Sequence, residues 1–220
     1  MIDFRLITQY IPDFINALFE TLKIALISGL ISIIIGIVVG TISTHKKKYI
    51  QIPVNIYTGF IRSTPLLVQL YFIHFGLPLV GIVLPSFQSA TIAFSLNTGA
   101  YVSEIFRGGL ESIDKGQHEA SKALGLSWFQ TMRLIIFPQV LKRVISPLIN
   151  QFSYLIKDTS LAAVLVIPEL TYMARKIAAR TYKPIEAFGI PLLMYFGIYL
   201  IFSTLSRLIG NKEKKKLRRA

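Results

Sequence analysis

Six polar and ionisable side chains interrupt stretches of this sequence that are otherwise apolar. Three of them are spaced at i, i+4 and i+7, which places them on one face of a helix, and the other three are consecutive. Together they offer hydrogen-bond donors for a carboxylate and acceptors for an ammonium group, the two charged ends of a zwitterion. The candidate binding residues are therefore Asn97, Tyr101, Glu104, Asp158, Thr159 and Ser160.

The charged members of this set also allow a purely structural interpretation. An ionisable group at membrane depth is costly, and it usually faces either a cavity or another charge. Glu104 and Asp158 could pair with Arg62, Arg107 or Lys157 and fix the register of neighbouring helices. At the level of the sequence both interpretations stay open.

The composition of the 220 residues indicates a membrane protein. Hydrophobic residues make up 53% and charged residues 16%, and the mean hydropathy is +0.57, whereas a soluble domain carries about 25% charged residues. This apolar content excludes a disordered chain, and a cysteine count of zero excludes a disulfide scaffold, thiol catalysis and cysteine-ligated metals. The net charge is +13, but six of the 24 basic residues lie in the last ten. That clustering favours a tail at a lipid surface over a nucleic-acid-binding protein.

Apolar stretches separated by charged residues predict five transmembrane helices, since a bilayer needs about 20 apolar residues per helix. We therefore expect an all-α, polytopic membrane bundle that forms one domain over residues 1–220. Prolines inside the stretches predict kinks around a cavity, and Pro65 and Pro147 fit poorly as helix ends. The predicted spans cover about 21–44, 49–77, 84–108, 138–167 and 186–208, with a cytoplasmic loop at 109–137 and a basic tail at 209–220.

The first predicted span has two further features. Residues 1–20 contain Pro12, Asp13 and Glu20, so we expect them to form an interfacial helix ahead of the span. Small residues at spacings near four, which let helices approach closely, form a stripe along the span itself. We assign to packing the residues Ser28, Gly29, Ser32, Gly36 and Gly40.

The distribution of basic residues predicts the orientation. With five spans and the N-terminus outside, the inner segments carry sixteen basic residues and the outer segments carry six. Cytoplasmic loops are enriched in Lys and Arg, so we expect the N-terminus outside and the C-terminus in the cytoplasm. Four outer residues depart from this bias and are expected on a surface helix that receives something from outside. They are Arg175, Lys176, Arg180 and Lys183.

The loop at 109–137 is predicted to form two short helices joined by a glycine turn. Residues 119–123 are favourable helix sequence, Gly125 suits a left-handed helix stop, and Ser127 suits an N-cap. An apolar face on the second helix would contain Phe129, Met132 and Ile136. Such a face needs a groove on a partner, unless the loop folds back on its own helices.

The same loop carries a motif that resembles the membrane subunits of ABC importers. The family motif reads Glu-Ala-Ala, three residues, Gly, nine residues and Ile-x-Leu-Pro. This chain has Glu119-Ala120-Ser121, Gly125 and Ile135-Ile136-Phe137-Pro138 at that spacing, with Ser121 and Phe137 as departures. The resemblance covers about residues 13 to 210 and is closest to permeases for polar amino acids. The blocks that narrow it are Arg62–Gln69, Glu104–Gly109 and Lys157–Leu161.

The resemblance implies a mechanism that needs several partners. Two permeases would pair around a pore, each would seat its 112–130 loop in a separate ABC ATPase subunit, and an extracellular or periplasmic solute-binding protein would deliver an amino acid. We expect a homodimer, because Glu104 and Asp158 of one chain could furnish both halves of a pore. Glu119 would contribute charge at a helix start or to a basic partner. The residues expected to couple to the ATPase are Glu119, Ala120, Gly125, Leu126 and Ser127.

The chain itself is not expected to be an enzyme. It contains no G-x-x-x-x-G-K-[ST] phosphate loop, so ATP and Mg²⁺ would bind the partner ATPase, and no cofactor or metal is expected in this chain. It also lacks H-E-x-x-H and G-x-S-x-G motifs, which argues against an intramembrane protease. We expect a multi-pass protein of the inner (plasma) membrane with no nucleic-acid partner.

Two carboxylates within the spans of a basic protein, Glu104 and Asp158, favour a basic substrate such as arginine, lysine or histidine. Glutamine or another neutral polar amino acid is the alternative for a permease of the same type. A channel or secondary transporter that works without an ATPase is a further alternative. Secondary transporters often show inverted internal repeats, and the sequence contains no convincing repeat.

Overall fold

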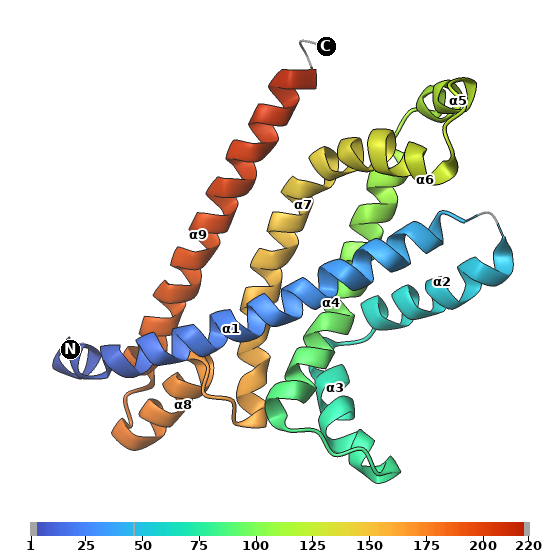
Figure 1. The fold of residues 1–220 in the computed structure, drawn as a ribbon. Coiled ribbons are helices and arrows are strands. Elements are labelled where there is room, and N and C mark those ends of the chain that lie inside the picture. The colour runs from blue at the N-terminus through green and yellow to red at the C-terminus, as the bar shows by residue number, and fades with distance from the viewer. Residues whose placement is uncertain (1–3, 46, 218–220) are drawn as a thin grey trace.

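A computed structural model describes residues 4–45 and 47–217, with side chains for residues 8–45 and 47–210. Every regular element of this described part is helical (Figure 1), which confirms the all-α membrane fold class. The α-helices are α1 (Phe4–Ser43), α2 (Lys48–Ser63), α3 (Leu66–Tyr71), α4 (Ser86–Glu111), α5 (Lys115–Ala123), α6 (Trp128–Gln130), α7 (Phe137–Asp158), α8 (Leu170–Thr181) and α9 (Pro184–Leu217). Short π or 3-10 segments are η1 (Phe72–Gly76), η2 (Leu77–Val80), η3 (Thr131–Ile136) and η4 (Thr159–Leu165).

The number of helices that can cross a bilayer is not simply five. Thr8–Ser43 and Pro184–Gly210 are long and apolar enough, and the bent pair Lys48–Ser63 and Leu66–Val80 would make a third. At about 1.5 Å per residue, the 26 residues of α4 and the 22 of α7 also reach across the apolar layer, but these helices carry more polar side chains. The five-span count therefore stays a prediction.

The helices differ from the predicted spans in two places. The expected interfacial segment and the first span form one continuous helix, α1, with Pro12 inside it. The stretch predicted as a span at 49–77 is broken, because α2 and α3 meet at 107°. Pro65 stands at this break as the N-cap of α3. It therefore marks a helix boundary, contrary to our expectation, whereas Pro147 lies inside α7 as expected.

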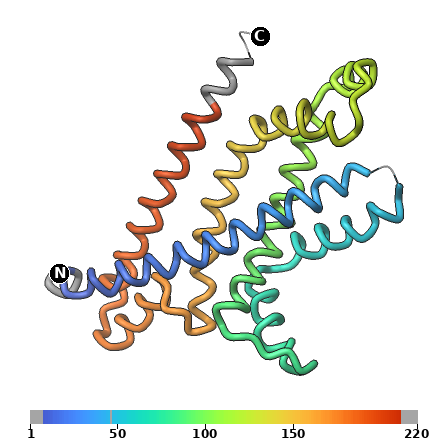
Figure 2. The backbone as a smooth tube through the Cα atoms, in the orientation of Figure 1, coloured from blue at the N-terminus to red at the C-terminus, as the bar shows by residue number. Residues whose placement is uncertain are grey.

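The helices α4, α7 and α9 stand side by side, and α1 crosses them obliquely (Figures 1 and 2). The stripe of small residues on α1 lies at this crossing. A β-carbon on Gly36 would collide with Val102 of α4, and one on Gly40 would lie 2.6 Å from the Ser103 carbonyl oxygen. The stripe therefore allows the close approach of helices that we assigned to it.

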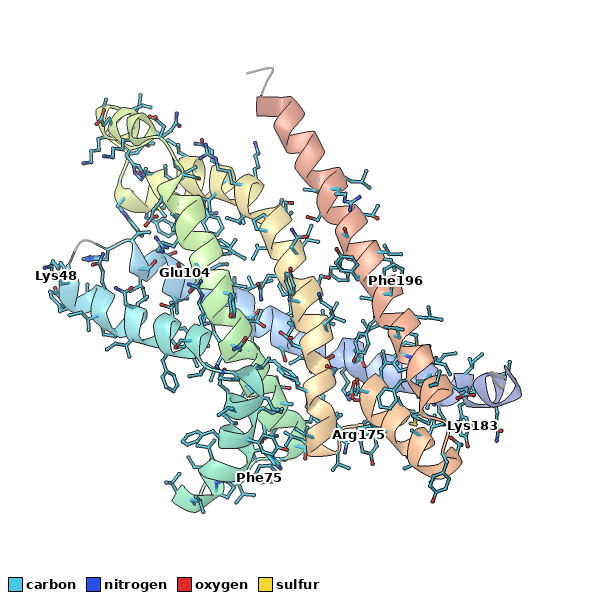
Figure 3. The ribbon with its side chains drawn as sticks, turned by 180° about the vertical axis from the view of Figure 1, so that it is seen from behind. Lys48, Phe75, Glu104, Arg175, Lys183 and Phe196 are labelled. Atoms are coloured by element: carbon cyan, nitrogen blue, oxygen red, sulfur yellow. The ribbon has the colours of Figure 1, made fainter. Side chains whose placement is uncertain are left out.

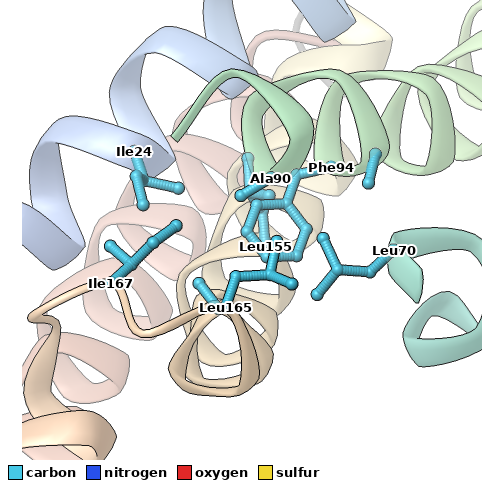
Figure 4. Close-up of a cluster of buried hydrophobic side chains, with 9 residues drawn as sticks. Ile24, Leu70, Ala90, Phe94, Leu155, Leu165 and Ile167 are labelled. Atoms are coloured by element: carbon cyan, nitrogen blue, oxygen red, sulfur yellow. The ribbon is translucent and has the colours of Figure 1, made fainter. Parts of the chain in front are cut away.

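Three buried clusters hold the bundle together. The central one joins five elements, with Ile24 from α1, Leu70 from α3, Phe94 from α4, Leu155 from α7 and Leu165 from η4 (Figure 4). Each of these side chains is at most 4% exposed. The cluster fixes the α2–α3 break against α4 and α7, and this is where the candidate site lies.

The two ends of the molecule differ in what they present. The segment α5–α6 and the C-terminal end of α9 lie at one end, and α8 and η2 lie at the other (Figure 1). The backbone of the predicted basic tail at 209–220 continues α9 to Leu217, and its basic side chains lie outside the described residues.

Candidate functional site

A cavity of about 420 Å³ lies where the α2–α3 break faces α4 and α7. The break contributes its wall because Thr64 is extended and Pro65 begins the next helix. Polar groups from α4 and α7 face this wall. The lining residues are Thr64, Pro65, Leu66, Asn97, Tyr101, Gln151, Tyr154 and Asp158.

A buried glutamine, Gln69, holds the break in place. Its Nε2 atom donates to the carbonyl oxygens of Ile61 at 2.7 Å and Thr64 at 3.1 Å, and to Thr64 Oγ1 at 2.8 Å. Its Oε1 atom accepts from Asn97 Nδ2 at 3.1 Å. Sequence reasoning did not assign a role to Gln69. The signal was its place at the end of the Arg62–Gln69 block, four residues after a proline.

The structure brings together three of the six predicted binding residues. Asn97, Tyr101 and Asp158 line the cavity. Thr159 is fully buried and its hydroxyl donates to the Ile156 carbonyl oxygen at 2.6 Å, so it serves the local helix. Ser160 is half-buried and is not part of the lining.

Glu104 is engaged in ion pairs and is not part of the cavity lining. Its Oε2 atom lies 2.7 Å from a guanidinium nitrogen of Arg107 and 3.4 Å from one of Arg62 on α2. Arg107 also pairs with Glu111 at 2.9 Å, and the Arg62 guanidinium lies 5.3 Å from the centre of the Tyr101 ring. Glu104 thus ties α2 to α4 one turn beyond the cavity.

Among the described side chains, Asp158 has no ion-pair partner, and the charge that acts on it is that of the adjacent Lys157. The Lys157 ammonium lies over the rings of Tyr154 at 4.2 Å and Tyr199 at 5.4 Å, and no ion pair joins Lys157 to Asp158 among the described side chains. The cavity therefore carries one carboxylate, with amide and hydroxyl groups around it and no basic side chain in its lining. The described residues contain no group of three His, Asp or Glu side chains that could hold a metal.

The loop after α4 has the predicted helix–turn–helix form. Gly125 has φ +70° and ends α5, and Ser127 makes a capping box with Gln130 at the start of α6. Asp114 is the N-cap of α5, and Glu119 is its fifth residue, so Glu119 does not mark a helix start. Ala120 is exposed and Leu126 is half-buried.

The apolar face of this segment is divided. Ile136 is buried, and Met132 packs on the same cluster with Val140 and Val144 of α7. The exposed apolar side chains of this segment are instead Leu124, Trp128, Phe129 and Leu134, which are 62–75% exposed. The expected single face of Phe129, Met132 and Ile136 is therefore wrong, because Met132 and Ile136 pack on the chain's own core while Phe129 stays exposed.

The helix α8 begins at a buried carboxylate. Both Glu169 oxygens accept N–H groups, from Thr171 at 2.9 Å and from Tyr172 at 2.6 Å, and the Tyr195 hydroxyl donates to one of them at 3.0 Å. Burial raises the pKa of the Glu169 carboxyl, and these donors offset only part of the rise.

The opposite face of α8 is basic and exposed. Leu170, Ala174 and Ile177 are buried, whereas Arg175, Lys176 and Arg180 are exposed. Figure 3 places Arg175 and Lys183 away from Glu104, toward the end that also holds Phe75. Three of the four predicted basic residues therefore lie on a surface helix, whereas Lys183 follows the end of α8 at Thr181 and is half-buried.

Comparison with known proteins gives consistent matches. Residues 32–218 match the family described as binding-protein-dependent transport system inner membrane component. The chain is 36% identical to the arginine transport system permease protein ArtQ of Bacillus subtilis over 97% of this chain and 98% of that protein. It is 38% identical to the probable glutamine ABC transporter permease protein GlnP of the same organism over 85% and 87%. A solved amino acid ABC transporter with histidines is 34% identical, with a TM-score of 0.88 over 96% of this chain and 99% of that one.

Proposed function

The chain belongs to the family of binding-protein-dependent inner-membrane transport components, as a multi-pass permease subunit of an amino-acid ABC importer, and on that premise we propose that its cavity at Asp158 binds a polar, basic amino acid. The observation that carries this proposal is the unpaired carboxylate in a cavity whose lining holds no basic side chain. Asp158 would attract a cationic substrate and bind its ammonium group. The Asn97 amide and the Tyr101 and Tyr154 hydroxyls are the donors suited to the carboxylate.

The runner-up is a neutral polar substrate such as glutamine. The position of Glu104 favours this substrate, because its carboxylate is engaged by Arg62 and Arg107 and is not part of the cavity lining, which leaves Asp158 as the carboxylate of the lining. One carboxylate suffices for the α-ammonium group that all amino acids share. The side-chain charge of a basic amino acid would then find no second carboxylate in the lining, and the rings of Tyr101 and Tyr154 already lie against Arg62 and Lys157.

Competition in proteoliposomes tests this proposal. The full complex is loaded with internal ATP and supplied with radiolabelled arginine against unlabelled arginine, glutamine or glutamate. We expect arginine to compete most strongly and glutamate least. Equal accumulation of glutamate and arginine would contradict a basic substrate, and stronger competition by glutamine would select the runner-up.

ATP would be hydrolysed by a partner subunit. In this proposal the exposed surface around Ala120, Gly125 and Trp128 seats in a groove of an ABC ATPase, which binds ATP and Mg²⁺. Glu119, Leu126 and Ser127 support that contact. The loop is joined to α7 because Arg143 donates to the Ser112 hydroxyl at 2.8 Å, so movement of the loop would be transmitted to the helix that carries Asp158. An ATPase-independent channel is not favoured, because the relatives are ABC permeases.

The arrangement in the membrane follows from charge. We propose that the N-terminus lies outside and the C-terminus in the cytoplasm, since α5–α6 shares its end of the molecule with the end of α9.

A second copy of this chain would complete the pore. An external solute-binding protein would dock on the exposed basic face of α8, and replacing Arg175, Lys176 and Arg180 by Gln is expected to slow uptake most at low concentrations of that protein.

A further inference from the structure

A second polar cavity lies between α7 and α9, beside the first. Its volume is about 350 Å³. The side chains that matter here carry hydroxyl, amide or guanidinium groups, and they are Asn150, Ser153, Tyr154, Tyr199, Ser203 and Arg207. Asn150 lies inside the predicted span 138–167, and exposing its amide to lipid would be costly, so this face is expected to meet water, a ligand or protein.

The Ser153 side chain indicates that this cavity binds a polar molecule. Its side chain is 6% exposed, and its oxygen has no hydrogen-bond partner among the described residues. One turn or more away, Ser146 and Ser206 satisfy each other, with 2.9 Å between their hydroxyl oxygens. Because a buried polar group without a partner costs about 1–3 kcal/mol, the Ser153 hydroxyl is suited to a bound polar molecule.

The two cavities share a wall. Tyr154 lines both of them, and the Lys157 ammonium lies over its ring. Asp158 lies on one side of Tyr154, and Ser203 and Arg207 lie on the other, toward the end of α9. That direction leads to the end of the molecule where α5 is found (Figure 1).

We propose that the α7–α9 cavity is a second binding site for the transported amino acid, occupied after it leaves Asp158 and before it reaches the cytoplasm. This inference rests on the proposed function. Arg207 pairs with the substrate carboxylate, and Asn150, Ser153 and Ser203 offer neutral acceptors for its ammonium group. Since no carboxylate lines this cavity, it binds the amino acid more weakly than the first cavity does, which suits a site of release.

Cysteine labelling tests the site in the full transporter, because the natural chain contains no cysteine. Ser203→Cys places a thiol in the cavity, and Thr204→Cys places one on the exposed neighbouring residue of α9, outside the lining. A hydrophilic methanethiosulfonate reagent is expected to label Ser203→Cys readily and Thr204→Cys slowly. Arginine at about ten times its Kd for this cavity is expected to slow the labelling of Ser203→Cys about tenfold, because bound arginine covers the thiol. It is expected to leave the labelling of Thr204→Cys unchanged.

Three results would overturn the inference. Labelling of Ser203→Cys that arginine does not slow would show a cavity that holds water but no substrate. No labelling would show a closed or lipid-covered face. A disulfide between two Ser203→Cys chains would place the cavity at an interface between copies. If the parent complex imports amino acids, each result removes only the second site, whereas a parent complex that imports none removes the proposed function with it.

A cavity-filling pair gives a separate readout. Ser203→Leu is expected to lower the maximum rate of ATP-driven uptake about fivefold or more with little change in KM, because the first cavity still binds substrate. Thr204→Leu is expected to keep the parent rate. Equal rates for the two variants would contradict passage through this cavity.

Discussion

Asn97 of α4 donates a hydrogen bond to Gln69 of α3 across 3.1 Å, and this contact joins the wall of the substrate cavity to the break that shapes it. Gln69 in turn satisfies the carbonyl oxygens of Ile61 and Thr64, which the break leaves without helical partners. The polar group that faces substrate and the bend beside it therefore belong to one network.

Gln69→Leu is expected to lower stability, because it keeps a similar volume and leaves two carbonyls and the Asn97 amide unpaired. Each lost hydrogen bond at a buried group costs about 1–3 kcal/mol. Thermal unfolding in detergent should show a lower Tm than that of Gln88→Leu, a change at an exposed residue of α4. An equal Tm for the two variants would contradict the role of Gln69.

Asp158→Asn and Glu104→Gln are expected to separate substrate binding from helix pairing. Asp158 is unpaired in the cavity, so its loss should raise the KM for arginine about tenfold or more, which corresponds to about 1.4 kcal/mol. Glu104 holds Arg62 and Arg107, so its change should lower Tm with a smaller effect on KM. Initial rates of uptake over a range of arginine concentrations would measure both. A larger rise in KM for Glu104→Gln than for Asp158→Asn would contradict this assignment and show that Glu104 binds substrate.

The sequence predicted the all-helical class and the local form of the loop, because both depend on near neighbours. Gly125 and Ser127 act through a turn and a cap within a few residues. Partners from other helices could not be predicted. The i, i+4, i+7 spacing placed Glu104 on the face of Asn97 and Tyr101, but Arg62, from a helix about forty residues away, turned it from the cavity. Hydropathy likewise did not reveal the break at Pro65, since both halves are apolar.

Gly36→Val is expected to destabilise the crossing of α1 and α4. A side chain there meets Val102, whereas a β-carbon on Gly59 of α2 would have no neighbouring atom within 4 Å, so Gly59→Val is the matched control. Both changes carry the same helix-propensity effect, and only the first adds overpacking, which costs about 1–3 kcal/mol. Thermal unfolding of both variants in one detergent measures the difference. A Tm for Gly36→Val as high as that of Gly59→Val would refute the close crossing.

Glu169 is expected to make stability depend on pH. Its pKa is raised in the folded protein above the usual value near 4.5, so the folded state holds the proton more tightly than the unfolded state. Stability from this group is therefore fully present below pH 4.5 and is lost as pH rises through the folded pKa, with a slope of at most about 1.4 kcal/mol per pH unit. The Tm of the parent protein should fall as pH rises above 4.5, and the Tm of Glu169→Gln should fall less over the same range. An identical profile in the variant would assign the dependence to other groups.

The most direct test of the account is whether the α5–α6 segment touches an ATPase. In the cysteine-free chain, Ala120→Cys on the exposed surface of α5 is joined by a short thiol-to-amine crosslinker in the assembled transporter, with Thr204→Cys as the control. We predict a covalent product of permease and ATPase from Ala120→Cys alone. A transporter that imports amino acids while Ala120→Cys yields no such product would contradict the account.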